Sequence, residues 1–164
     1  MLNLSRWKSN LVTILLMILV YLAIRHYQLQ DYQTDQAPAF SAANQQGQVI
    51  NLLDFRGQPL ILYFWADWCP VCKLQKDNIE ELADDYNIIT VASWSGTENN
   101  LYDYFQHPKL QQTTIIDPDG IIASRYGVSG VPSIFIIDSN GIIQYIERGF
   151  TTTTGIKLRL LTLP

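Results

Sequence analysis

The sequence predicts an α/β domain in which a central mixed sheet is flanked by helices. The segment PLILYFWA (residues 59–66) is continuously apolar and aromatic, which is typical of a strand buried on both faces. The segment that follows carries apolar residues at roughly helical spacing with charged residues between them, namely Leu74, Ile79, Leu82 and Tyr86. Because further strand-like and helix-like segments alternate toward the C-terminus, we expect one sheet with helices on its faces.

Composition and charge indicate a single globular domain that does not bind nucleic acid. The chain has 164 residues, of which 48% are hydrophobic and 16% charged, so it can bury one core and form one domain. The net charge is −4, and it is unevenly distributed. The first 26 residues contain basic but no acidic residues, so the remainder of the chain is clearly acidic. We therefore expect no nucleic acid among the partners.

The N-terminal segment is predicted to be a membrane anchor over residues 1–26. The run from Leu11 to Ile24 is apolar, and residues 9–24 carry no charge. These 16 residues would span about 24 Å as a helix, against a hydrocarbon core of about 30 Å. The flanking aromatic and basic residues would extend the span to residues 7–26, with Trp7, Tyr21 and Tyr27 as interfacial anchors and Arg6, Lys8 and Arg25 snorkelling.

A cleaved signal peptide and a buried soluble helix are the alternatives to this anchor. No small-x-small cleavage site follows the run closely, because Ala23 precedes Ile24, Arg25 and His26, and Ala37-Pro38-Ala39 lies too far downstream. We therefore favour an uncleaved anchor, with the chain beyond it outside the cytoplasm. The polar, Gln-rich residues 27–38 are predicted to be a linker, and residues 39–164 the folded domain.

The only two cysteines, Cys69 and Cys72, form a C-x-x-C pair. A structural disulfide across two residues would remove little entropy from the unfolded chain. A structural zinc site needs more ligands than the pair supplies, and the only histidines, His26 and His107, are distant in sequence. Thiol–disulfide exchange is favoured with no metal or cofactor, while a copper site made by the two thiolates stays open.

The pair lies where the buried strand is expected to turn into the amphipathic helix. The positive end of the helix dipole there would favour a thiolate at Cys69. Pro70 suits the first turn of a helix because it has no N–H to lose. Cys72 would then lie about one turn into the helix, close enough to resolve a mixed disulfide.

The remaining elements are predicted in order along the chain. A second buried strand covers residues 87–94, and the capping-box spacing of Ser95 and Glu98 predicts a helix using Leu101, Tyr104 and Phe105. A loop over residues 109–113 leads to a short strand and an Asp-Pro-Asp-Gly turn. Residues 133–138 and 142–148 read as a strand–turn–strand hairpin, and residues 153–164 as a closing helix.

Three motifs resemble those of the thioredoxin superfamily. YFWADWCPVCK (residues 63–73) is similar to its active-site stretch, and YGVSGVPSIFIID (residues 126–138) followed by SNG is similar to its cis-proline loop and hairpin. The resemblance covers about residues 37–164 and implies a thioredoxin fold with an N-terminal extension, a central insertion and one N-terminal transmembrane helix. The chain looks most like the membrane-tethered branch typified by TlpA, ResA and DsbE, and within it like the suppressor-of-copper-sensitivity D proteins.

The resemblance also implies roles for particular residues. Cys69 and Cys72 would be the catalytic, redox-active pair. Pro132 matches the cis-proline, and Val131 before it would offer backbone groups to an extended substrate segment. Trp68 would hold a partner protein through its apolar surface. The other expected neighbours of the pair are Pro70, Val71 and Gln75.

Two positions depart from the family pattern. Compact thioredoxins have a buried Asp six residues before the first cysteine, where this chain has Tyr63. The ResA-like branch has a Glu three residues after the second cysteine, where this chain has Gln75. Gln75 can hydrogen-bond but cannot take a proton, so deprotonation of Cys72 would depend on water, on nearby lysines or on another acid such as Asp67.

The resemblance thus implies a protein thiol–disulfide oxidoreductase in the bacterial inner membrane, single-pass, with its domain facing the periplasm. Its partners would be envelope proteins with cysteines, a membrane electron donor or acceptor, and the lipid bilayer through residues 7–26. A reductase is favoured, and an oxidant stays open. A copper-binding or copper-stress protein and an interaction module without catalysis are the alternatives.

Overall fold

The computed structural model describes residues 4–29, 36–44, 46–96, 101 and 104–164, with the side chains of the first helix described for residues 10–22. The chain divides into two compact units, Met1–Asp31 and Tyr32–Pro164, each of which is described by itself. The first unit contains helix α1 (Leu4–Leu29). The elements of the second are β1 (Ser41–Ala43), β2 (Val49–Asn51), η1 (Leu52–Phe55), β3 (Leu60–Trp65), α2 (Pro70–Leu82), β4 (Asn87–Ser93), α3 (Pro108–Thr113), β5 (Thr114–Asp117), α4 (Ile121–Arg125), β6 (Ser133–Ile137), β7 (Ile143–Arg148) and α5 (Thr153–Leu161).

Helix α1 contains the apolar run that the sequence marks as a possible anchor. It holds neither glycine nor proline, so nothing in its composition interrupts the helix. The side chains of residues 10–22 are all exposed. Within the described part of the chain, no helix is both long enough and apolar enough to span a bilayer. The transmembrane helix therefore stays a prediction.

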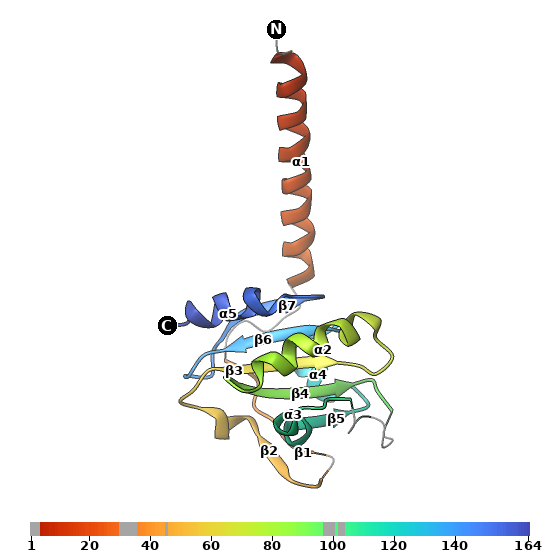
Figure 1. The fold of residues 1–164 in the computed structure, drawn as a ribbon, viewed down its shortest axis with the longest axis vertical. Coiled ribbons are helices and arrows are strands. Elements are labelled where there is room, and N and C mark those ends of the chain that lie inside the picture. Colours follow the sequence, from red (N-terminus) through yellow and green to blue (C-terminus); the bar gives the residue numbers. More distant parts are fainter. Residues whose placement is uncertain (1–3, 30–35, 45, 97–100, 102–103) are drawn as a thin grey trace. The chain divides into compact units, whose positions relative to one another are not determined.

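The second unit is built on a five-stranded mixed sheet in the order β5-β4-β3-β6-β7. Strand β3 runs parallel to β4 and antiparallel to β6, so it occupies the centre of the sheet (Figure 1). All six of its residues are buried. The expected mixed sheet and the central buried strand are confirmed, and β1 and β2 form a separate antiparallel pair.

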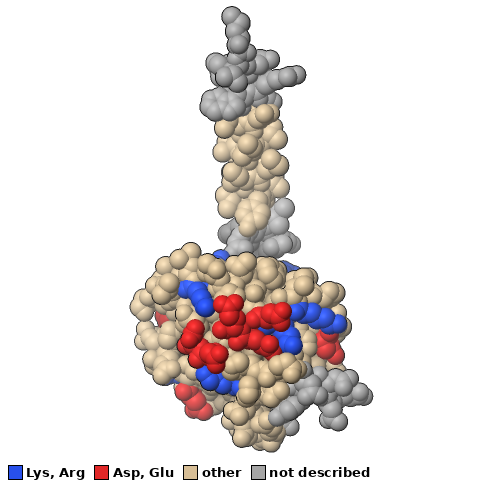
Figure 2. Space-filling model, in the orientation of Figure 1, with Lys and Arg blue, Asp and Glu red and all other residues tan. Residues whose placement is uncertain are grey.

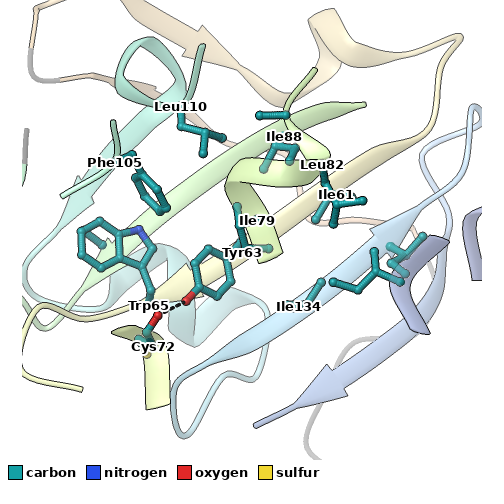
Figure 3. Close-up of a cluster of buried hydrophobic side chains, with 14 of the residues drawn as sticks. Ile61, Tyr63, Trp65, Cys72, Ile79, Leu82, Ile88, Phe105, Leu110 and Ile134 are labelled. Atoms are coloured by element: carbon teal, nitrogen blue, oxygen red, sulfur yellow. Dashed lines mark hydrogen bonds between the residues drawn. The ribbon is translucent and has the colours of Figure 1, made fainter. Parts of the chain in front are cut away.

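The two faces of β3 pack against different layers. Ile61, Tyr63 and Trp65 join one core cluster with residues of α2 and α5 (Figure 3). On the other face, Phe64 packs against Tyr126 and Phe135, with ring centroids 5.4 and 5.5 Å apart. Because neighbouring residues of a strand point to opposite faces, the six residues fill two cores at once.

Helix α2 covers one face of the sheet (Figure 1). Its buried residues are Cys72, Gln75, Ile79 and Leu82, at helical spacing. Its outer side carries Glu80 and Glu81, which pair with Lys76 and Lys157, and this mixed charged surface faces the viewer in Figure 2. Pairs at such exposed positions add little to stability, so α2 is held mainly by its buried side.

The predicted loop over residues 109–113 is wrong, because these residues form most of helix α3. His107 caps this helix by accepting a hydrogen bond from the Lys109 N–H through its ring Nδ1, and Pro108 occupies the first turn. A histidine cap is uncommon, so the sequence pattern did not indicate a helix start. Helix α4 was not predicted either, since five residues are too few to show periodicity.

The helix expected after Ser95 falls largely on residues 97–100 and 102–103, which lie outside the described residues. The described members of that segment pack in the core, since Leu101 and Phe105 are buried. The hairpin and the closing helix are present as β6–β7 and α5. Thr152 caps α5 by accepting a hydrogen bond from the Gly155 N–H, which defines a start that the run of threonines had obscured.

Candidate active site

Cys69 is the N-cap residue of α2, directly after the turn that ends β3. Its backbone is extended, and its sulfur accepts a hydrogen bond from the Cys72 N–H at 3.2 Å. A capping side chain normally offers an oxygen at this position. Here the sulfur receives one of the unpaired N–H groups of the first turn, and the positive end of the helix dipole favours negative charge on it.

Cys72 lies one turn further along α2 and is fully buried, whereas Cys69 is 4% exposed. Both cysteines are free thiols in this structure. Burial, followed by a hydrogen bond with Cys69, raises the pKa of Cys72 to about 12. The two sulfurs therefore differ in character: one caps a helix at the edge of the surface, and the other is a protonated thiol in the core.

The cis-proline loop lies against this pair. The Val131–Pro132 peptide bond is cis, as the resemblance implied. The Cys69 thiol lies 3.6 Å from the carbonyl oxygen of Val131, to which it donates a weak hydrogen bond. Pro132 is held in turn by its carbonyl, which accepts a hydrogen bond from the Gly149 N–H at 2.9 Å. The structure thus brings Cys69, Cys72, Val131 and Pro132 together.

Apolar side chains surround the cysteines on the surface. Trp68 is 61% exposed, and Val71 is also exposed. The indole N–H of Trp68 donates to the carbonyl oxygen of Trp94 at 2.9 Å, so the ring is tethered although it is open to solvent. Trp94 adopts a left-handed backbone (φ 53°), which is rare for a bulky residue and is found preferentially near functional sites. Pro70 is exposed in the first turn of α2.

Asp67 is close to the pair in sequence but is engaged in the local turn. Its carboxylate accepts a hydrogen bond from the Trp68 N–H at 2.8 Å, and its own N–H donates to the Ser95 hydroxyl at 3.1 Å. These bonds fix the turn between β3 and α2. They support a positioning role for Asp67 at this turn.

Gln75, which replaces the acid of the ResA-like pattern, is fully buried and structural. Its side-chain amide donates to the Thr151 carbonyl at 2.9 Å, and its oxygen accepts the Thr151 N–H at 2.8 Å. Both ends of the amide are therefore used to pair α2 with the backbone just before α5. Sequence reasoning missed this contact, because nothing in a local pattern connects residues 75 and 151.

Sequence reasoning also missed what lies beneath Cys72. The hydroxyl of Tyr63, on β3, points toward Cys72 and lies 3.5 Å from its carbonyl oxygen (Figure 3). In the sequence alone, Tyr63 stands out only as a departure from the family pattern. The alternation along β3 was a usable signal, since it places residues 61, 63 and 65 on the face that α2 covers.

A metal site of three or more ligands is not formed by the described residues, since no group of that size combines histidine, cysteine and acidic side chains. His107 is engaged elsewhere, capping α3 and contacting the Asp84 carboxylate at 3.2 Å. A copper site made by the two thiolates alone stays a prediction.

Comparison with known proteins finds matches to thioredoxin-like proteins and thiol-disulfide oxidoreductases. The model of the AhpC/TSA family matches residues 34–146. A "Thioredoxin-like protein" of Haemophilus influenzae is 29% identical over 155 residues, which cover 93% of this chain and 92% of that protein. The thiol-disulfide oxidoreductase ResA of Bacillus cereus is 31% identical over 117 residues, 68% of each chain.

Solved structures agree with the fold. The exposed lipoprotein thioredoxin of Streptococcus pneumoniae superimposes with a TM-score of 0.67 at 27% identity, covering 77% of this chain and 100% of that one. The thioredoxin-like fold implied by the sequence motifs is therefore confirmed.

Changing Gln75→Glu should destabilise the domain at neutral pH. A carboxylate can still accept the Thr151 N–H, but it cannot donate to the Thr151 carbonyl, which then keeps only the Asn78 side chain as a donor and faces a buried negative charge. We expect the free energy of unfolding to fall by about 1–3 kcal/mol, measured by urea denaturation.

The matched control is Gln58→Glu. The Gln58 oxygen only accepts a hydrogen bond, from the Asn87 side chain at 2.8 Å on the surface, and a carboxylate can do the same. We expect the stability of this variant to change by less than about 0.5 kcal/mol. Equal losses of stability in both variants would contradict the role of Gln75 in joining α2 to the backbone at Thr151.

Proposed function

The chain belongs to the AhpC/TSA family and is a protein thiol–disulfide oxidoreductase of the ResA type, and we propose that it reduces disulfides of envelope proteins through Cys69 and Cys72. The observation that carries the proposal is the asymmetry of the pair at the cis-proline loop. Cys69 caps α2 with 4% of its surface exposed, 3.6 Å from the Val131 carbonyl, while Cys72 has no exposed surface.

We propose that the two steps of exchange use different sulfurs. The Cys69 thiolate attacks a sulfur of the partner's disulfide, so a Cys69–partner bond forms and the other partner sulfur leaves as a thiolate. Cys72 then loses its proton to solvent and attacks the Cys69 sulfur. The Cys69–Cys72 bond forms, the partner leaves fully reduced, and the pair has given it two electrons.

The surroundings of Cys69 support recognition of an extended segment of the partner. Val131 is half-buried, so its backbone groups can pair with a strand-like segment beside Cys69. The exposed Trp68 and Val71, which flank Cys69 in the sequence, offer apolar surface. We propose that these groups bind the residues around the partner's cysteine, with backbone pairing supplying affinity for many sequences.

We propose that electrons flow from the pair to the partner, and the buried sulfur supports this direction. A strong oxidant of this kind needs its reduced form stabilised. Burial disfavours charge on Cys72 and raises its pKa, so that sulfur does not stabilise the reduced pair as a thiolate. This supports a reductase, which a membrane electron donor must recharge after each turnover.

We expect Cys69→Ser to abolish reduction of insulin disulfides and Cys72→Ser to accumulate mixed disulfides with partner proteins. Without Cys69 no attack occurs, and without Cys72 the first intermediate cannot be resolved. Turbidity measures insulin reduction, and non-reducing gels with mass spectrometry identify the trapped species.

Two results would overturn the proposal. Insulin reduction by Cys69→Ser at the wild-type rate would remove the assigned nucleophile. A wild-type pair that is mostly oxidised in the cell would contradict the direction of electron flow. Tight binding of Cu(I) by the reduced pair without turnover would favour the copper-binding alternative.

Tethering to the bacterial inner membrane, with the domain on the periplasmic side, is the second part of the proposal. Its support is the run of exposed apolar side chains on α1, a helix that belongs to a compact unit of its own. Residues 7–26 would contact the bilayer, and residues 27–38 would be the linker that connects the membrane helix to the domain.

The full chain should stay in the membrane fraction after alkaline carbonate extraction. Changing Leu15→Arg and Leu19→Arg together should release it, because each arginine near a bilayer centre costs about 2.5–3.5 kcal/mol. Leu53→Arg, at an exposed position of η1, is the control and should remain membrane-bound. Extraction of the unmodified chain into the soluble fraction would contradict the tether.

A further inference from the structure

The buried side of the active site contains a hydroxyl group that takes no part in the exchange steps proposed for Cys69 and Cys72. Tyr63, on β3, is fully buried, and its ring extends toward Cys72 (Figure 3). Its hydroxyl lies 3.5 Å from the Cys72 carbonyl oxygen. Among the described residues, no carboxyl group contributes to the pKa shift of Cys72, since Gln75 is bonded to Thr151 and the Asp67 carboxylate is bonded in the turn.

The proton of the Tyr63 hydroxyl is only weakly held by that carbonyl. Hydrogen bonds between a hydroxyl and an oxygen are normally 2.5–3.0 Å long, so a contact of 3.5 Å is a poor one. The Cys72 sulfur is a second acceptor, because the Tyr63 and Cys72 side chains share a hydrogen bond. A buried thiolate would attract this proton strongly, because hydrogen bonds to a charged group are roughly twice as strong as neutral ones.

The protonation states of the two groups are compatible with this arrangement. Burial, followed by the proximity of Cys72, raises the pKa of Tyr63 well above its ordinary value, so the phenol keeps its proton. Burial raises the pKa of Cys72, and the hydrogen bond with the Tyr63 side chain acts in the opposite direction. Tyr63 is therefore a neutral donor, and it does not serve as a base.

We propose that Tyr63 donates a hydrogen bond to the Cys72 sulfur as it becomes a thiolate, and so speeds resolution of the mixed disulfide. The inference rests on the proposed exchange function and adds a residue to its second step. The Cys72 proton leaves to solvent, the Tyr63 proton stays on the phenol, and the Cys72 thiolate attacks Cys69. A hydrogen-bond donor thus replaces the carboxylate of related sites, and the rate of resolution follows the thiolate fraction.

A second tyrosine offers an internal comparison. The Tyr104 hydroxyl is buried and has no hydrogen-bond partner among the described residues, and its ring stacks on Trp65 with centroids 3.8 Å apart. Burial, followed by the charges of Cys72 and Cys69, raises the pKa of Tyr104, so it too stays neutral. The titratable and charged groups around Cys72 and this ring are Cys69, Tyr63, Tyr104, Asp67, Asp77 and Lys76.

The two steps can be timed separately with one equivalent of the aromatic disulfide 5,5′-dithiobis(2-nitrobenzoate). Attack by Cys69 releases the first coloured thiolate, and resolution by Cys72 releases the second. In the wild type we expect the second rate to rise about tenfold per pH unit from pH 6 to 9, following the thiolate fraction. With Tyr63→Phe we expect the same slope, a second rate lower by about ten- to a hundredfold, and an unchanged first rate.

Tyr126→Phe is the matched control, because it also removes a buried hydroxyl bond, to the Pro38 carbonyl at 2.9 Å, on the opposite face of the sheet. It should leave both rates unchanged, and so should Tyr104→Phe. A second rate within twofold of wild type for Tyr63→Phe, or an equal slowing by Tyr126→Phe, would overturn the inference. Absence of both releases in the wild type would instead overturn the proposed function.

Replacement of Tyr63 by 3-fluorotyrosine keeps the ring and hydroxyl, so it tests the same idea if Tyr63→Phe fails to fold. Fluorination makes the phenol a stronger donor, and the second rate should increase at a pH where the phenol remains protonated. A purely structural role would leave this rate unchanged, and that result would overturn the inference.

Discussion

The hydrogen bond from the Cys72 N–H to the Cys69 sulfur is the contact on which the site depends. It makes Cys69 the N-cap of α2, and so determines where the helix begins and where each later residue points. Strand β3 provides the fixed base for this turn, because it is buried on both faces and paired on both edges. Cys69 thereby keeps a small exposed surface at the start of the helix, and Cys72 is carried fully into the core.

The core side of α2 combines stability with reactivity. Gln75 joins the helix to the backbone at Thr151, and Ile79 and Leu82 pack in the main cluster. These contacts hold Cys72 where charge is disfavoured, which raises its pKa. The same burial that stabilises the domain therefore slows resolution, and a nearby neutral donor such as Tyr63 would offset part of that effect.

Local pattern predicted most of the fold and the reacting pair. The apolar run of β3, the helical spacing after Cys72 and the turn between β6 and β7 are each contained in one short segment. The α3 helix was missed because its cap is a histidine, and α4 because it is too short to show a period. The roles of Gln75 and Tyr63 depend on contacts across the core, which no local pattern contains. The membrane anchor stays a prediction from the apolar run.

The different environments of the two thiols are the central claim, and the alkylation rates of the reduced protein test it most directly. Iodoacetamide reacts with thiolates, so at pH 7 the account predicts that Cys69 is modified at least about a hundredfold faster than Cys72, as located by peptide mass spectrometry. Comparable rates at the two cysteines, or faster modification of Cys72, would contradict the assignment of attack to one sulfur and resolution to the other.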